Sequence, residues 1–126
     1  MIAVVDDDES VCRALKRLVR TFGMDVETFG SGQAFIEAIT ARPSYHIDCV
    51  VLDLQMPGLN GLQVQERLSG LRRCLPVIFI TAHEEPGVRE RAIAAGAAAF
   101  VRKPFSDEVF IDTLRDAIGR GPGAPA

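Results

Sequence analysis

The chain has 126 residues, of which 48% are hydrophobic and 25% charged, and its formal net charge is −3. This length predicts one domain with a buried core, and the composition excludes an intrinsically disordered chain. No apolar run approaches the roughly 20 residues of a membrane-spanning helix, and the negative charge gives no electrostatic footprint for nucleic acid. The first residues do not have the pattern of a signal peptide.

Cysteine usage indicates the redox compartment. The three cysteines, Cys12, Cys49 and Cys74, are an odd number and lack the spacing of a metal site. We therefore expect a reduced, cytoplasmic protein.

Short apolar runs alternate with segments whose apolar residues recur at helical spacing. Strands are predicted over residues 2–5, 25–29, 49–54, 76–81 and 98–101. Helices are predicted after the N-cap residues Ser10, Ser31 and Ser106, with Gly23 and Pro43 ending the first two, and also through residues 62–68 and 87–96. This alternation predicts an α/β protein with a doubly wound, five-stranded parallel sheet covered on both faces. The Gly/Pro/Ala-rich residues 120–126 are expected to be a flexible tail or linker stub.

Polar side chains follow four of the predicted strands. Asp6 and Asp7 follow the first, Asp53 lies near the end of the third, Thr81 ends the fourth, and Lys103 follows the fifth. Because the carboxyl ends of parallel strands meet at one edge of a sheet, and ligands bind there, we expect these groups to lie close together.

Carboxylates this close repel one another, and either a hard divalent cation such as Mg²⁺ or a buried ammonium relieves the repulsion. Carboxylates, a hydroxyl, Lys103 and Mg²⁺ suit phosphoryl transfer, which needs positioning and neutralisation of charge on the transferred oxygens. Asp53 would be the nucleophile and would form an aspartyl phosphate.

Each of these groups taken alone has an ordinary structural explanation. An acidic run commonly begins a helix, Asp53 could cap the following Pro-Gly turn, Thr81 could simply end a strand, and Lys103 could be a surface charge. The functional hypothesis depends on all four falling at one edge of the predicted sheet.

Four segments together resemble the receiver domain of two-component response regulators over residues 1–118: "VVDDDES", "VVLDLQMPGLNG", "PVIFITAH" and "AFVRKPF". Asp8 and the segment "MDVETFGSGQAFI" resemble the FixJ-type subgroup, whose members usually carry a helix-turn-helix output domain. The resemblance implies a flavodoxin-like sheet with strand order 2-1-3-4-5 and a receiver domain over residues 1–119.

The resemblance also implies a role for each site residue. Asp53 is the implied phosphorylation site, and Mg²⁺ is bound directly by Asp7, Asp53 and the backbone carbonyl of Gln55, and indirectly by Asp6. Thr81 and Lys103 are implied to contact the phosphoryl oxygens.

The same comparison implies an aromatic switch residue at Phe100, a cis bond between Lys103 and Pro104, and flanking positions at Gln55 and His83 that tune the phosphate lifetime.

The function expected from this resemblance is a signalling switch with self-catalysed phosphoryl transfer and autodephosphorylation. The implied partners are a sensor histidine kinase, a second copy in a phosphorylation-dependent homodimer, and a DNA-binding output domain beyond Ala126. We expect no membrane association, and no direct nucleic acid binding by this domain.

Two alternatives remain open. A phosphohydrolase with an aspartyl-phosphate intermediate would carry an acid two residues after the nucleophile, where this chain has Gln55. A flavodoxin-like binding module would need a Ser/Thr/Gly phosphate loop after the first strand, where the acidic residues 6–9 would repel a phosphate.

Overall fold

The computed structural model describes residues 1–42, 44–71, 74–83 and 85–120. All strands of its sheet are parallel, in the order β2-β1-β3-β4-β5. The strands are β1 (Ile2–Val5), β2 (Val26–Phe29), β3 (Cys49–Asp53), β4 (Val77–Thr81) and β5 (Ala99–Arg102). The helices are α1 (Glu9–Thr21), α2 (Gly32–Ala41), α3 (Gly61–Gly70), α4 (Val88–Ala94) and α5 (Asp107–Arg120).

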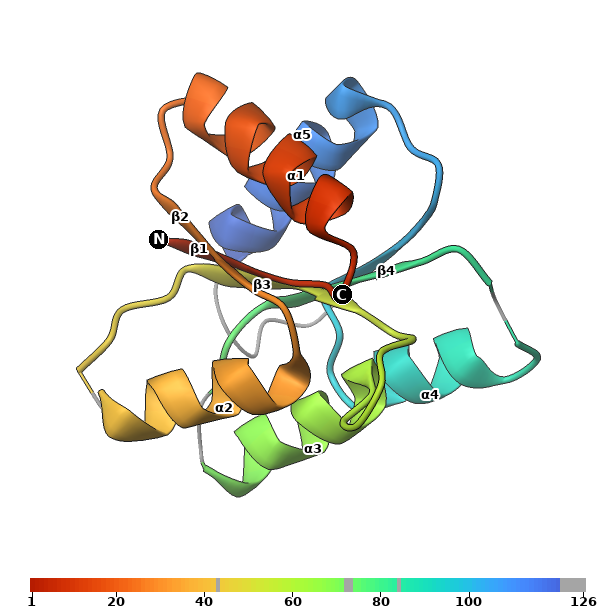
Figure 1. The fold of residues 1–126 in the computed structure, drawn as a ribbon. Helices are drawn as coiled ribbons and strands as arrows, with labels where there is room; N and C mark the ends of the chain where they lie inside the picture. The colour runs from red at the N-terminus through yellow and green to blue at the C-terminus, as the bar shows by residue number, and fades with distance from the viewer. Residues whose placement is uncertain (43, 72–73, 84, 121–126) are drawn as a thin grey trace.

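Helices cover both faces of the sheet, with α1 and α5 on one side and α2, α3 and α4 on the other (Figure 1). This arrangement confirms the doubly wound, flavodoxin-like fold with strand order 2-1-3-4-5. Predicted and observed strand boundaries agree at five of the ten ends and differ by one residue at the other five, because hydrogen bonding rather than apolar character decides where a strand stops. The expected tail lies outside the described residues beyond Arg120.

The central strands alternate between two hydrophobic clusters. In β3 and β4, Val51 and Ile78 pack in the cluster beneath α1 and α5, whereas Leu52 and Phe79 pack in the cluster beneath α2, α3 and α4. This is the two-residue periodicity of a strand whose faces are both buried. The same alternation decides toward which face of the sheet the side chain of a residue at a strand end points.

Two of the three predicted serine N-caps are confirmed. The Ser31 Oγ accepts a hydrogen bond from the Ala34 N–H at 3.1 Å, and the Ser106 Oγ accepts one from the Val109 N–H at 3.1 Å. Gly23, with φ of 81°, follows the end of α1 as predicted.

The prediction that Ser10 caps α1 is wrong, because Asp8 takes that position. The Asp8 Oδ1 accepts hydrogen bonds from the Ser10 N–H at 2.9 Å and the Val11 N–H at 3.4 Å. A carboxylate caps a helix as well as a hydroxyl does, so the helix begins earlier, at Glu9. Helix α2 ends at Ala41, while Pro43, the predicted stop, lies outside the described residues.

No helix in the described ranges is both long and apolar enough to cross a bilayer.

Candidate functional site

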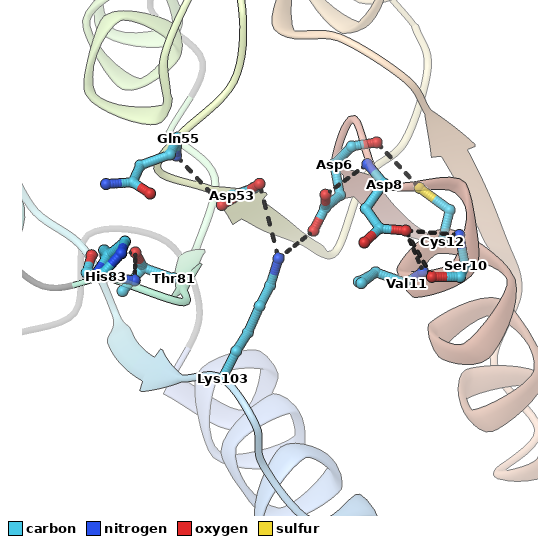
Figure 2. A network of polar contacts seen from close by, with 10 residues as sticks. All are labelled: Asp6, Asp8, Ser10, Val11, Cys12, Asp53, Gln55, Thr81, His83 and Lys103. Atoms are coloured by element: carbon cyan, nitrogen blue, oxygen red, sulfur yellow. Dashed lines mark hydrogen bonds and ion pairs between the residues drawn. The ribbon is translucent and has the colours of Figure 1, made fainter.

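Three charged side chains meet at the carboxyl ends of β1, β3 and β5. The Lys103 Nζ donates a hydrogen bond to Asp6 Oδ2 at 2.9 Å and lies 3.7 Å from Asp53 Oδ2 (Figure 2). Asp6 and Asp53 are buried, with 1% and 5% of their surface exposed. The alternation of side chains along β1 and β3 places both carboxylates on the face covered by α1 and α5, which explains why they point toward one lysine.

Asp7 completes an acidic cluster with Asp6 and Asp53. One carboxylate oxygen from each residue lies within 4.8 Å of the other two, and the Asp7 side chain is exposed to solvent. Carboxylate oxygens at an open, partly hydrated site are the donors that Mg²⁺ prefers. The donor set therefore fits a magnesium ion.

Burial makes the charge on Asp53 costly. Desolvation first, and then the neighbouring Asp6 carboxylate, raise the pKa of Asp53 to about 6, although Lys103 and the Gln55 N–H oppose this shift. Burial by itself would lower the pKa of Lys103, but the hydrogen bond with Asp6 and the charges of both carboxylates outweigh it, and the pKa is raised. The lysine therefore stays protonated at neutral pH, while the carboxylates carry more negative charge than it neutralises.

Backbone hydrogen bonds orient the two buried carboxylates. The Asp53 Oδ1 accepts a bond from the Gln55 N–H at 3.2 Å, and the Asp6 Oδ1 accepts one from the Asp8 N–H at 2.9 Å. Each bond is local, two residues along the chain, so each carboxylate is positioned by the turn that follows its own strand.

Thr81 lies near this group but is not bonded to it. Its hydroxyl donates a hydrogen bond to the His83 carbonyl oxygen and accepts one from the His83 N–H at 3.2 Å. Thr81 continues the alternation of β4 on the opposite face from Asp53, together with Phe79. Figure 2 shows Thr81 and His83 on one side of Asp53 and Asp6 on the other.

Phe100 is half-buried on the same face as Thr81. Its ring centroid lies 6.3 Å from that of Phe79, and the Arg89 guanidinium carbon lies 4.9 Å from its centroid. The ring therefore contacts both the core and a residue of α4. The Lys103–Pro104 peptide bond is cis, as the family resemblance implied.

Gly61 controls how closely α3 approaches Asp53, a role that no sequence motif indicated. A Cβ at this position would lie 2.7 Å from the Asp53 carbonyl oxygen and 2.9 Å from the Leu54 Cα. The only sequence signal was the Asn-Gly pair before the helix, which indicates a turn and not a close approach. Gly61 thus permits the packing that holds the third strand end in place.

We expect Gly61→Ala to lower the free energy of unfolding by about 1–3 kcal/mol, because the backbone must shift to admit the methyl group. Gly70→Ala is the matched control at the other end of α3, where a Cβ meets nothing within 4 Å. The free energy of unfolding of that variant should rise by up to about 1 kcal/mol, because Ala has a higher helix propensity than Gly. Urea denaturation measures both, and equal stability of the two variants would contradict the close approach.

This fold and this site together are characteristic of the receiver domains of two-component signalling. The family model described as "Response regulator receiver domain" matches residues 2–115, and the chain belongs to that family. Receiver domains of this family bind Mg²⁺ at an acidic pocket, and the Asp6, Asp7 and Asp53 cluster corresponds to one.

Similar proteins agree with this membership. The chain is 37% identical over 122 residues to the response regulator protein TodT of Pseudomonas putida, covering 97% of this chain and 52% of TodT. It is 32% identical over 117 residues to FixJ of Bradyrhizobium diazoefficiens, covering 93% of this chain and 56% of FixJ. It thus spans about half the length of these curated relatives.

Among solved structures, a response regulator receiver protein from Burkholderia phymatum is 53% identical, with a TM-score of 0.83, and 99% of this chain and 98% of that chain are covered. The family membership favours a signalling switch over the phosphohydrolase and the flavodoxin-like binding module.

Proposed function

We propose that Asp53 accepts a phosphoryl group from the phosphohistidine of a sensor histidine kinase. The observation that carries this proposal is the buried Asp53 carboxylate, 3.7 Å from the Lys103 ammonium and within the acidic cluster. An Asp53 oxygen forms the new bond to phosphorus, the phosphorus–nitrogen bond breaks, and the imidazole leaves with its electron pair.

The neighbouring residues have distinct proposed roles. Lys103 turns from Asp53 toward a phosphoryl oxygen while it keeps its hydrogen bond to Asp6. Asp7, Asp53 and the backbone carbonyl of Gln55 would hold Mg²⁺ directly, and Asp6 would contribute indirectly, through water or hydrogen bonding. Bound Mg²⁺ supplies positive charge that offsets the acidic cluster and the phosphoryl oxygens.

Intact-mass measurement after incubation with acetyl phosphate and Mg²⁺ tests the phospho-acceptor role without knowledge of the kinase. One added phosphoryl group per chain is expected. No mass increase under conditions that label another receiver would end the proposal. The proposed autodephosphorylation, with Gln55 and His83 beside the phosphoryl group, is measured as the decay of the same species.

The wider protein is also part of the proposal. FixJ of Bradyrhizobium diazoefficiens is described as a transcriptional regulatory protein, and TodT and FixJ are both about twice as long as this chain. This supports a DNA-binding output domain beyond Ala126 in a cytoplasmic regulator. Phosphorylation-dependent homodimerisation through α4, β5 and α5 is proposed as the link between receiver and output. Light scattering that finds an unchanged monomer after phosphorylation would refute that link.

Thr81 and Phe100 are proposed to carry the phosphorylation signal to α4. The Thr81 hydroxyl now bonds to the His83 backbone, and a phosphoryl group on Asp53 would offer it a charged acceptor instead. Its movement would release the loop before α4, and the Phe100 ring beneath Arg89 would repack.

We expect Thr81→Ala to bind the phosphate mimic beryllofluoride at Asp53 but to lose most of the chemical-shift change in residues 85–101. Backbone amide NMR spectra with and without the mimic measure this. Thr40→Ala is the control, because that hydroxyl donates a hydrogen bond within its own helix, to the Ile36 carbonyl at 2.7 Å, and the described residues include no other partner for it. A full wild-type shift pattern in Thr81→Ala would rule out the relay.

A further inference from the structure

The first turn of helix α4 is not fixed by a side-chain cap. Its N-cap residue is Gly87, which has no side chain to accept a hydrogen bond from the turn. The N-cap side chains of α1, α2 and α3 each accept such a bond, and the Ser106 hydroxyl does so at α5. The start of α4 is therefore positioned by its own first residues, of which Val88 is buried in the core and Arg89 is exposed.

Arg89 contacts an aromatic ring on β5. Its guanidinium carbon lies 4.9 Å from the centroid of the Phe100 ring, within the roughly 6 Å at which cation–π attraction acts. The centroid of the half-buried Phe100 ring lies in turn 6.3 Å from that of the buried Phe79 ring. Phe100 therefore links the start of α4, through Arg89, to the central strand β4.

The loop that leads into α4 is fixed at its other end by Thr81. The Thr81 hydroxyl bonds to the backbone of His83, at the beginning of this loop. Thr81 and Phe79 share one face of β4, two residues apart, and Phe79 pairs in register with Phe100 of β5. The loop is thus fastened by Thr81 at the strand end and by Arg89 at the helix start.

We propose that Arg89 is a positioning residue of the switch, whose guanidinium holds the Phe100 ring in place and so favours the conformation without a phosphoryl group. The inference rests on the proposed relay through Thr81 and Phe100, and it names the residue that sets the resting equilibrium of that relay. The ring leaves Arg89 when the relay switches, so loss of the contact destabilises the resting conformation alone. A ligand that favours the switched conformation then binds with a higher apparent affinity.

Charge attraction alone predicts the opposite result. Beryllofluoride is negatively charged when it is bound to a carboxylate, so removal of a cation would weaken its binding at Asp53 by Coulomb's law. Loss of a contact that favours the resting conformation strengthens the binding instead. The sign of the effect of an Arg89 substitution therefore separates the positioning role from a general electrostatic one.

The test is a titration with beryllofluoride in the presence of Mg²⁺, followed by backbone amide NMR spectra. Arg89→Gln removes the cation, Arg89→Lys keeps one at the same position, and Phe100→Leu removes the aromatic ring. Arg115→Gln is the control, because it removes the same charge and the same kind of contact from α5, where the Arg115 guanidinium carbon lies 5.1 Å from the centroid of the Phe22 ring.

In Arg89→Gln we expect the apparent affinity for beryllofluoride to rise about two- to fivefold, which is the effect of losing one exposed cation–π contact. Without the mimic, the amide resonances of residues 85–101 should lie closer to their mimic-bound positions than they do in the wild type. Arg89→Lys should retain most of the wild-type behaviour. Arg115→Gln should change the affinity by less than about 1.5-fold.

The Phe100→Leu background shows whether Arg89 acts through the ring. There, Arg89→Gln should change the affinity by less than about 1.5-fold, because the aromatic partner is absent and every other interaction of Arg89 is retained in the comparison. An unchanged or lower affinity in Arg89→Gln, or a rise that recurs in the Phe100→Leu background or in Arg115→Gln, would overturn the role of Arg89 and leave Asp53 as the acceptor. Absence of any response of residues 85–101 to the mimic in the wild type would overturn the relay together with it.

Discussion

Replacement of Asp53 by Asn is expected to abolish phosphorylation completely. The amide that replaces the carboxylate is a far weaker nucleophile, and Asp6, the other buried carboxylate of the acidic cluster, is hydrogen-bonded to Lys103 at 2.9 Å. With acetyl phosphate and Mg²⁺, the wild type should gain one phosphoryl group and Asp53→Asn none. Intact mass spectrometry measures this difference directly.

The control for this prediction is Asp25→Asn, because Asp25 is exposed and precedes β2 at the other edge of the sheet. It makes the same chemical change without touching the cluster and should be labelled like the wild type. Labelling of Asp53→Asn to the wild-type level would show that another side chain is the acceptor. Loss of labelling in both variants would point to a general loss of folding instead.

The second large expected effect is a dependence of stability on pH that originates at Asp53. Burial raises the pKa of Asp53 from its usual 3.8 to about 6, so the folded protein holds this proton more tightly than the unfolded chain does. Stability should therefore fall as pH rises from about 4 to about 6 and stay lower above that window. The shift corresponds to at most about 3 kcal/mol, at about 1.4 kcal/mol per pH unit.

Asp53→Asn isolates this contribution. Its free energy of unfolding should exceed that of the wild type at pH 7–8, and the difference should shrink as pH falls toward 4. Lys103 does not titrate in this window, because its pKa is raised, and the lowered pKa of Asp8 and Asp48 affects stability only at lower pH.

Added Mg²⁺ should raise the stability of the wild type at neutral pH and reduce the difference, because an ion that binds only the folded state stabilises it by mass action. Chelation of the metal should restore the difference. Urea denaturation from pH 4 to pH 8, with Asp25→Asn as the charge control, measures the effect. A constant difference across this range would show that Asp53 is not the residue responsible.

The amino-acid sequence by itself determined the architecture and the membership of the site. Short apolar runs such as residues 49–52 and 77–80 indicate strands buried on both faces, and the helical periods between them indicate parallel pairing. Parallel strands put their carboxyl ends at one edge. Asp6, Asp53, Thr81 and Lys103 were therefore placed together before any contact was known.

The tertiary structure decided which of these groups touch. Lys103 bonds to Asp6 at 2.9 Å and lies farther from Asp53, while Thr81 bonds to His83. Strand alternation puts Thr81 on the opposite face from the other three, and the turns after each strand set the remaining directions. The N-cap of α1 is Asp8 and not Ser10, because neighbouring polar side chains compete for the same backbone N–H groups and sequence alone does not say which one binds them.

Close approach between elements was also invisible in the sequence. In the sequence Gly61 has the pattern of an ordinary turn glycine. In the structure a Cβ at this position would lie 2.7 Å from the Asp53 carbonyl oxygen. In the sequence Arg91 has the pattern of an ordinary helix-surface residue. In the structure α4 packs beside the β3–α3 loop, and Arg91 and residues of that loop line one cavity. Sequence periodicity assigns each residue to a face of its own element. The distance between two faces depends on how whole elements pack, and only the tertiary structure provides it.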